Sequence, residues 1–327
     1  MYTLYPFARP FLFALDPETA HDIAFAGLDR AAKLGLASIV ATRVPDDPVE
    51  VMGIEFPNRV GLAAGLDKNG AHVDGLATFG FGFFDRTQLA AAAKHWVARG
   101  FTRLKMTVGN EALRRRDSRA LADVIKEDAA RVRAVREAVG PDIELFIDAN
   151  CNLDLYHAMH LAEMIKPYGI GFFEEPLSQN DVHQMAELRR ISGMALACGQ
   201  NEGLLFRFRD LLLNKSVDIL QPNVAIGGGF TQCVKIAGMA SAFNVPIANG
   251  GAWPFHNMHL HAGVANGGLV EYHLPAVNLC AQVFDGLPMP KDGWLTLPAT
   301  PGLGFSPNID RVRELAKRPL SGGRGKG

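Results

Sequence analysis

Polar side chains that can bind cations or exchange protons recur at the ends of short apolar runs between positions 105 and 271. Each apolar run has the composition of a buried strand, and the polar residue stands at or near its downstream end. From position 148 onward these residues lie 22 to 26 positions apart, a distance that one strand, one helix and two short loops would fill. They are Lys105, Asp148, Glu174, Gln200, Asn223, Asn249 and Glu271.

This spacing predicts an α/β fold in which strands and helices alternate around a TIM-type (β/α) barrel. We expect strands at 104–107, 145–148, 171–174, 196–200, 219–223, 246–249 and 269–271, and helices at 89–98, 127–139, 157–166, 182–191, 206–213, 231–243 and 258–265. In a parallel barrel the downstream strand ends open on one face, so the polar side chains would converge on one mouth. Residues 81–85 are expected to be the first barrel strand, with the strand at 60–64 outside the barrel or displacing it.

Composition excludes several classes of protein. The 327 residues are 48% hydrophobic, which is enough for one large core, and the net charge of −1 without a long basic run argues against nucleic acid as a partner. No apolar run is long enough to cross a membrane, and no secretory signal is present. The four cysteines lack CxxC spacing, which is typical of reduced thiols, so we expect a cytoplasmic protein.

The first part of the chain has a different character. Residues 2–36 carry aromatic and apolar side chains at helical spacing and predict a helical hairpin, packed on the body of the protein or, alternatively, leaning on a membrane surface. A glycine-rich loop follows at 61–70, with the sequence GLAAGLDKNG. Backbone amides in such a loop can approach a phosphate or a flat ring closely.

Residues 1–84 resemble the amino-terminal segment of class 2 dihydroorotate dehydrogenases, above all in the decamer at 61–70. The resemblance implies a hairpin that contacts the membrane and forms a quinone entrance. It also implies that Ala64, Gly65 and Lys68 lie in a loop that touches flavin mononucleotide and orotate. Nothing after Asp85 matches that family's other flavin and phosphate loops or its catalytic serine region. We therefore expect neither bound flavin nor dihydroorotate oxidation, and a flavin-dependent oxidoreductase ranks last among the hypotheses.

Residues 85–319 resemble the mandelate racemase and muconate lactonizing enzyme branch of the enolase superfamily. The motifs are GFTRLK (100–105), DAN (148–150), EEP (174–176), QPN (221–223) and IGG (226–228). The resemblance implies three carboxylates that hold Mg²⁺, and a base that removes the proton α to a substrate carboxylate. By position, Asp148 and Glu174 match the first two metal ligands and Lys105 matches the first lysine of the KxK motif. Glu271 matches the carboxylate that hydrogen-bonds to the substrate.

The departures from that family are as informative as the matches. Thr107 stands where the usual base, the second lysine of KxK, is expected, and Gln200 stands in place of the third metal-binding glutamate. Asn223 and Asn249 replace the aspartate and histidine of the barrel's dyad. None of these four side chains titrates near neutral pH, so the expected proton acceptors are missing.

Other residues could compensate for these replacements. Gln200 can bind Mg²⁺ through its amide oxygen, and Glu202 can supply a carboxylate if its loop turns inward. Lys105 can act as the base if the metal and burial lower its pKa. Asn150, with Asn223 and Asn249, is a candidate for contacts with the substrate, and Glu175 is expected to turn outward and pair elsewhere. Four histidines follow the last strand ends, and each is more often a core or helix residue than a base: His256, His259, His261 and His273.

We therefore expect a dihydroorotate-dehydrogenase-like segment at 1–84, an enolase-type barrel without its usual amino-terminal capping domain at 85–319, and a flexible tail at 320–327. The hypothesis for its function is a Mg²⁺-dependent lyase or isomerase, of dehydratase or racemase type, acting on a hydroxy acid or acid sugar. The alternative is a catalytically impaired barrel or binding module of chimeric origin. The resemblance also implies a homo-oligomer, although the missing capping domain removes a usual interface.

Overall fold

The computed structural model describes residues 49–51, 54–56, 85–109 and 119–317. The chain divides into two compact units, 1–83 and 84–327. In the first, β1 (Val49–Val51) and β2 (Ile54–Phe56) form an antiparallel pair. The expected hairpin at 2–36, the glycine-rich loop with Ala64, Gly65 and Lys68, and the tail at 320–327 lie outside the described residues.

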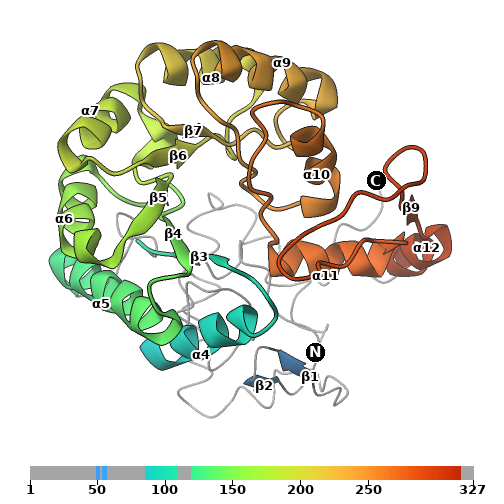
Figure 1. Cartoon of the computed structure of the whole chain (residues 1–327), viewed down its shortest axis with the longest axis horizontal. Coiled ribbons are helices and arrows are strands. Elements are labelled where there is room, and N and C mark those ends of the chain that lie inside the picture. Colours follow the sequence, from blue (N-terminus) through green and yellow to red (C-terminus); the bar gives the residue numbers. More distant parts are fainter. Residues whose placement is uncertain (1–48, 52–53, 57–84, 110–118, 318–327) are drawn as a thin grey trace, which may run out of the picture. The chain divides into compact units, whose positions relative to one another are not determined.

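The second unit is built on a parallel sheet of five strands in sequential order. These are β3 (Arg103–Thr107), β4 (Glu144–Asp148), β5 (Ile170–Glu174), β6 (Leu196–Cys198) and β7 (Ile219–Leu220). The predicted strands over 104–107, 145–148, 171–174, 196–200 and 219–223 are present, two of them shorter than expected. Helices surround these strands in a ring (Figure 1). The predicted α/β fold of alternating strands and helices is thereby confirmed for this part of the chain; strands covered on both faces consist of continuous apolar runs.

The register of the strands aligns the polar residues at their carboxyl ends. Thr107 of β3 pairs with Asp148 of β4, and Asp148 pairs with Glu174 of β5. Residues in register on parallel strands face the same side of the sheet, and residues two apart on one strand do so as well. Lys105, two residues before Thr107, therefore shares its face with both carboxylates.

The expected strands at 246–249 and 269–271 are wrong in the regular form predicted. Leu220 and Ile247 form a single bridge, and the Asn249 backbone N–H donates to the Leu269 carbonyl at 2.7 Å, but neither segment is a strand. Pro246 lacks a backbone donor, and glycines at 267 and 268 precede the second segment, so a continuous ladder cannot form. Asp85, the last residue of the strand expected at 81–85, is the N-cap of the helix that begins at Arg86, while residues 81–84 and the strand expected at 60–64 lie outside the described residues.

Nine α-helices are described in this unit, most of them close to their predicted ranges. They are α4 (Arg86–Val97), α5 (Leu121–Val139), α6 (Leu155–Ile165), α7 (Val182–Ser192), α8 (Leu204–Leu213), α9 (Gly229–Ala242), α10 (Pro254–Ala262), α11 (Leu274–Val283) and α12 (Ile309–Lys317). Carboxylates of Asp85, Asp154 and Asp181 cap α4, α6 and α7 by accepting backbone N–H bonds. No helix in the described part of the chain is both long and apolar enough to cross a membrane.

Several short elements complete the unit. The helix α11 was not predicted from the sequence pattern. The 3₁₀ helices η3 (Lys166–Tyr168) and η4 (Ser178–Asn180) extend or precede helices, and β8 (Phe284–Asp285) pairs with β9 (Ser306–Pro307). Helix α11 begins with Pro275 in its first turn and packs Val277 and Cys280 against Phe255 of α10. Burial of this aromatic cluster explains why a segment of modest helix propensity is helical.

An aromatic stack fills the barrel interior beneath the polar residues. The rings of Phe146 and Phe172 lie 4.2 Å apart and nearly parallel, packed against Ala197. Phe146 precedes Asp148 by two positions on β4, so it faces the same interior. Both rings are almost fully buried. The stack therefore forms an apolar floor close to the side chains that the strand ends present.

Candidate active site

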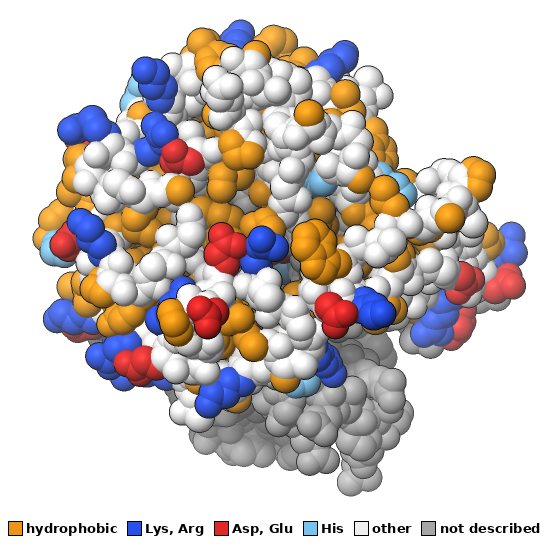
Figure 2. All heavy atoms as spheres, in the orientation of Figure 1, with side chains coloured by type: hydrophobic (Ala, Val, Ile, Leu, Met, Phe, Trp, Pro, Cys, Tyr) orange, Lys and Arg blue, Asp and Glu red, His pale blue; other side chains and the backbone are white. Residues whose placement is uncertain are grey.

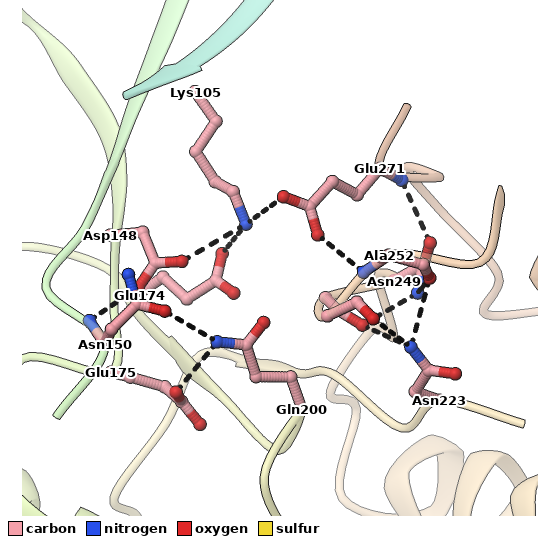
Figure 3. Close-up of polar contacts among 12 residues, drawn as sticks. Lys105, Asp148, Asn150, Glu174, Glu175, Gln200, Asn223, Asn249, Ala252 and Glu271 are labelled. Atoms are coloured by element: carbon pink, nitrogen blue, oxygen red, sulfur yellow. Dashed lines mark hydrogen bonds and ion pairs between the residues drawn. The ribbon is translucent and has the colours of Figure 1, made fainter. Parts of the chain in front are cut away.

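Four of the predicted residues meet at the mouth of the barrel (Figure 3). The ammonium nitrogen of Lys105 lies 2.6 Å from Glu174 Oε2, 2.8 Å from Glu271 Oε1 and 3.6 Å from Asp148 Oδ2. The Glu174 side chain is fully buried, and the other three are at most 16% exposed. The face in Figure 2 likewise shows acidic and basic side chains together near its centre, among hydrophobic ones.

This arrangement holds a charge imbalance in a buried place. Three carboxylates and one ammonium sum to −2 when all are ionised. Burial opposes the charged form of Lys105, but the three carboxylates outweigh it and hold the pKa of Lys105 well above its ordinary value. Lys105 is therefore protonated at neutral pH in this state of the site, and its ammonium acts as an internal counterion.

The carboxylates respond to the same imbalance in different ways. Burial raises the pKa of Asp148 to about 7 despite the nearby lysine, and burial together with Asp148 raises the pKa of Glu174. Burial also works against ionisation of Glu271, yet Lys105 and His273 lower its pKa below the usual value. The positive charge near Asp148 and Glu174 is thus too small to offset the cost of burying them in their ionised form. For Glu271, the charges of Lys105 and His273 do offset that cost.

Glu271 is held by the loop that follows the 246–249 segment. The Ala252 backbone N–H donates to Glu271 Oε2 at 3.1 Å, and the Glu271 backbone N–H donates to Asn249 Oδ1 at 3.1 Å. The other oxygen of Glu271 is left to accept from Lys105. The loop at 250–253 therefore determines which way this carboxylate faces.

Asn223 and Asn249 use their amides to hold that same loop. Asn223 Nδ2 donates to the carbonyls of Gly250, Gly251 and Ala252 at 2.7, 3.0 and 3.1 Å. Asn249 Nδ2 donates to the Gly250 and Ala252 carbonyls at 2.9 and 3.2 Å. A carboxylate could not make these contacts, because it has no hydrogen to donate. In this arrangement both asparagines act on the backbone of the loop.

Asn257 also holds this loop, through Asn223, and it was not among the candidates from the sequence. We call Asn223, Asn249 and Asn257 together the amide lock. Its Nδ2 donates to Asn223 Oδ1 at 3.0 Å and its Oδ1 accepts from the Val224 backbone N–H at 2.9 Å. The lock stabilises Ala252 and Trp253, which both have positive φ, of 71° and 61°. A single asparagine on a helix carries no sequence signal for such a role.

Gln200 and Asn150 lie beside the carboxylates of the mouth. The backbone N–H of Asn150 donates to Asp148 Oδ1 at 2.8 Å. Gln200 Nε2 donates to Glu175 Oε2 at 2.9 Å and lies 3.4 Å from Asn150 Oδ1. The Gln200 oxygen points the other way, toward Glu174 (Figure 3). Glu175, expected to turn outward, is instead fully buried next to the site.

Glu202 occupies a neighbouring cluster rather than the position beside Lys105. Its carboxylate accepts from Arg207 Nε at 2.8 Å and from Asn180 Nδ2 at 3.1 Å. Asn180 Nδ2 also donates to Glu175 Oε1 at 3.0 Å, so the two clusters share this residue. Because Arg207 supplies the counter-charge to Glu202, that carboxylate is already paired.

Several buried polar atoms facing this region have no hydrogen-bond partner among the described residues. They are Glu174 Oε1, the hydroxyl of Thr107, and both amide atoms of Gln221. Thr107 is in register with Asp148, and a Cβ atom placed on Gly250 would lie 2.9 Å from Glu174 Oε1 and 3.0 Å from Gln221 Nε2. Unpaired buried polar groups are costly, and they concentrate where a ligand or ion completes the bonding.

The histidines near the last strand ends have varied surroundings. His256 packs edge-on against Phe284 and Phe305, and His259 Nε2 lies 3.0 Å from the Leu303 carbonyl. His261 Nδ1 accepts from the Gly268 backbone N–H. His273, two residues after Glu271, is exposed, and desolvation lowers its pKa although the charge of Glu271 acts in the opposite direction.

The donors at the mouth fit a hard divalent cation. In the part of the chain that the structure describes, no three Asp, Glu, His or Cys side chains are arranged to hold a metal ion. Asp148 and Glu174 provide two carboxylates, Glu174 has an unpaired oxygen, and the Gln200 amide oxygen faces the same side. Mg²⁺ accepts such a mixed set of oxygens, and its charge of +2 would cancel the −2 of the cluster.

Comparison with known proteins agrees with this geometry. A model of the family described as "Enolase C-terminal domain-like" matches residues 88–312. A racemase from Streptomyces coelicolor A3(2), solved with bound magnesium, is 29% identical, with a TM-score of 0.62, and the match covers 71% of this chain and 60% of that one. L-Talarate dehydratase from Polaromonas sp. JS666, solved with Mg and L-glucarate, is 26% identical, with a TM-score of 0.63 and coverage of 72% and 61%.

The amino-terminal region matches a different protein. Dihydroorotate dehydrogenase (quinone) from Herminiimonas arsenicoxydans is 62% identical over 82 residues, which is 25% of this chain and 23% of that protein. The chain thus spans about a quarter of the length of such curated relatives, and about six tenths of the racemase and dehydratase chains. Since the family match covers most of the chain and the site lies within it, the protein belongs to the enolase C-terminal domain-like family, in its mandelate racemase and muconate lactonizing enzyme branch.

Proposed function

We propose that this protein is a Mg²⁺-dependent lyase or isomerase that removes the proton α to the carboxylate of a hydroxy acid or acid sugar. The observation that carries the proposal is the cluster of Asp148, Glu174 and Glu271 around Lys105, in which three carboxylates share one ammonium and Glu174 keeps an unpaired oxygen. A buried site with that imbalance favours a divalent cation strongly.

Asp148, Glu174 and the amide oxygen of Gln200 would hold the cation. A bound Mg²⁺ supplies Lewis-acid stabilisation of the enediolate that forms when the α-proton leaves. Lys105 lies beside these ligands, and its three carboxylate neighbours raise its pKa, so its side chain carries a positive charge. Its ammonium is suited to stabilise negative charge as it develops on the substrate carboxylate.

The other side chains of the mouth define how a substrate would be held. The unpaired hydroxyl of Thr107 is available to a substrate hydroxyl, and the carboxylate of Glu271 is oriented by Ala252 and Lys105. In a dehydration the α C–H bond breaks, its proton passes to the carboxylate of Glu271, and its electron pair stays in the enediolate. The β-hydroxide then takes up a proton from the Lys105 ammonium and leaves as water, and the contact of 2.8 Å between Glu271 and Lys105 lets the first proton return to the lysine. A hydroxylated acid is therefore the substrate class that suits the site, as the L-glucarate complex of the Polaromonas dehydratase supports.

A second candidate function is a barrel that binds a small carboxylate or a cation without turning it over. The amides of Asn223 and Asn249 favour it, because they stand at the dyad positions and are occupied with the backbone of the 250–253 loop. A site without a base on that side cannot invert an α-carbon by the two-base route. Flavin chemistry through Lys68 stays the third hypothesis.

The test is α-proton exchange. The protein is incubated in D₂O with Mg²⁺ and a panel of acid sugars, and the reaction is followed by ¹H NMR. We expect at least one compound to exchange its α-proton for deuterium or to be converted to a 2-keto acid. Asp148→Ala should abolish the signal, and the exposed control Asp310→Ala should retain it. Turnover that is equal in Asp148→Ala and the wild type would refute the proposed site, and binding without exchange would favour the second candidate.

A further inference from the structure

We propose that Glu175 is a positioning residue that turns the side-chain amide of Gln200 so that its oxygen faces Glu174. This neutral oxygen then serves as the third cation ligand. The inference rests on the proposed function, since it explains how a glutamine can stand at a metal-binding position. It concerns a residue that touches neither cation nor substrate.

The hydrogen bonds of Gln200 determine the orientation of its amide. Its Nε2 lies 2.9 Å from Glu175 Oε2 and 3.4 Å from Asn150 Oδ1, so both neighbours on that side are acceptors. The amide therefore presents its N–H groups to Glu175 and Asn150, because only its nitrogen can donate to these oxygens. The oxygen is left on the opposite side, where the carboxylate of Glu174 lies (Figure 3).

Glu175 is itself held rigidly enough to impose this choice. It is fully buried, and its Oε2 accepts from Asn201 Nδ2 at 2.6 Å while its Oε1 accepts from Asn180 Nδ2 at 3.0 Å. With Gln200, three side-chain amides donate to this one carboxylate. A side chain that also donates at position 175 would disrupt this set of hydrogen bonds.

The backbone explains why two consecutive glutamates both reach the region of the site. Successive residues on a strand point to opposite faces, so Glu175 should turn away when Glu174 turns inward. Glu175 instead has a φ of +38°, which breaks the alternation directly after β5. A positive φ is strained for a residue with a side chain, and strain of this kind is typical of functional sites.

The oxygen side of Gln200 is kept open by two glycines. A Cβ atom on Gly251 would lie 3.3 Å from Gln200 Oε1, and one on Gly250 would lie 2.9 Å from Glu174 Oε1. Larger residues would therefore press on both oxygens. Without a side chain at these two positions, neither the amide oxygen nor the unpaired carboxylate oxygen is crowded by a Cβ atom.

A swap of the two side chains tests this relationship. Gln200→Glu alone places a carboxylate against Glu175 and should lower the urea midpoint of the metal-free protein. Glu175→Gln alone leaves four amides facing one another, so that Gln200 can present its nitrogen to the cation. The double variant Glu175→Gln/Gln200→Glu restores a donor–acceptor pair, with a carboxylate oxygen free for the metal.

Two readouts are needed, urea unfolding without metal and Mg²⁺ calorimetry. We expect Glu175→Gln to weaken Mg²⁺ binding by about tenfold, as for other residues that orient a ligand, and the double variant to bind at least as tightly as the wild type. In the metal-free protein the double variant should recover the midpoint lost by Gln200→Glu. The exposed Glu144→Gln, whose residue pairs with Arg103, is the control and should change Mg²⁺ affinity by less than about twofold.

The outcomes separate this inference from the proposed function. If the wild type binds Mg²⁺ but Glu175→Gln binds it within twofold of the wild type, or the double variant does not recover, Glu175 does not orient Gln200. If the wild type binds no Mg²⁺, the proposed function fails. The midpoints of the metal-free variants then still decide whether the two side chains form the required donor–acceptor pair.

Discussion

Lys105 and Glu174 form a buried ion pair in which Nζ lies 2.6 Å from Oε2, while the other oxygen of Glu174 has no partner among the described residues. One lysine thus serves three carboxylates and leaves one oxygen of Glu174 unpaired. The same ammonium that would face a substrate also stabilises the buried carboxylates, which ties the stability of the fold to the chemistry of its mouth.

Replacement of Lys105 should destabilise the protein more than its loss of contacts suggests. Lys105→Met leaves three buried carboxylates without a cation, and we expect the free energy of unfolding at pH 7 to fall by about 3–5 kcal/mol in urea titrations. Millimolar Mg²⁺ should restore part of this loss. Lys126→Met is the control, because Lys126 is 68% exposed and pairs with the exposed Asp123, so it should cost less than about 1 kcal/mol. Equal effects of the two changes would contradict the ion-pair account.

Because Asn223 holds the 250–253 loop, we expect that changing it to the aspartate of the family's aspartate–histidine dyad would destabilise the protein. Asn223→Asp removes the donor to three carbonyls and places a charge against them, so we expect a loss of about 3 kcal/mol in the free energy of unfolding. Chemical denaturation measures it. Asn278→Asp, on the exposed side of α11, should be within about 0.5 kcal/mol of the wild type. A stable Asn223→Asp protein would show that the loop is held by other contacts.

His261 should make stability depend on pH. Burial lowers its pKa from 6.5 to about 4 in the folded chain, and its Nδ1 must stay unprotonated to accept from the Gly268 N–H. As pH falls below 6.5 the unfolded chain binds the proton first, so stability is lost between pH 6.5 and 4, by about 3 kcal/mol in total. His261→Asn, which keeps an acceptor, should flatten this part of the profile relative to the wild type. An unchanged slope in that variant would exclude His261 as its source.

Two glycine-to-alanine changes should act in opposite directions. A Cβ atom on Gly171 would lie 2.5 Å from the ring of Phe146, so Gly171→Ala should cost about 1–3 kcal/mol by disturbing the aromatic floor. A Cβ atom on Gly238, inside α9 and exposed, meets nothing within 4 Å, and Gly238→Ala should gain about 1 kcal/mol. Thermal unfolding of both variants checks the signs, and the same sign for both would contradict the packing of the floor.

Much of the strand arrangement was predictable from the sequence, for a physical reason. The apolar runs before Asp148 and Glu174 are buried on both faces, and their regular spacing leaves little choice but a parallel sheet. The strand expected at 246–249 is reduced to a single bridge at Ile247. Its apolar residues suggested a strand, but Pro246 has no backbone N–H to donate to a ladder. Helix α11 was missed because its stability comes from contacts with Phe255, far away in sequence.

The details of the site were less predictable. The meeting of Lys105 with three carboxylates followed from strand register, which spacing can predict. The inward turn of Glu175 depends on a single positive φ, and the lock by Asn257 depends on where a helix begins. Neither leaves a pattern in the sequence, because each results from backbone geometry that tertiary contacts impose.

Mg²⁺ calorimetry on the wild type and Asp148→Ala tests the central claim most directly. The excess of buried carboxylates over ammonium predicts saturable Mg²⁺ binding with one site per chain in the wild type and its loss in Asp148→Ala, with Asp310→Ala unchanged. Absence of binding by the wild type at millimolar Mg²⁺, or equal binding by Asp148→Ala, would contradict a metal-dependent site at the ends of β4 and β5.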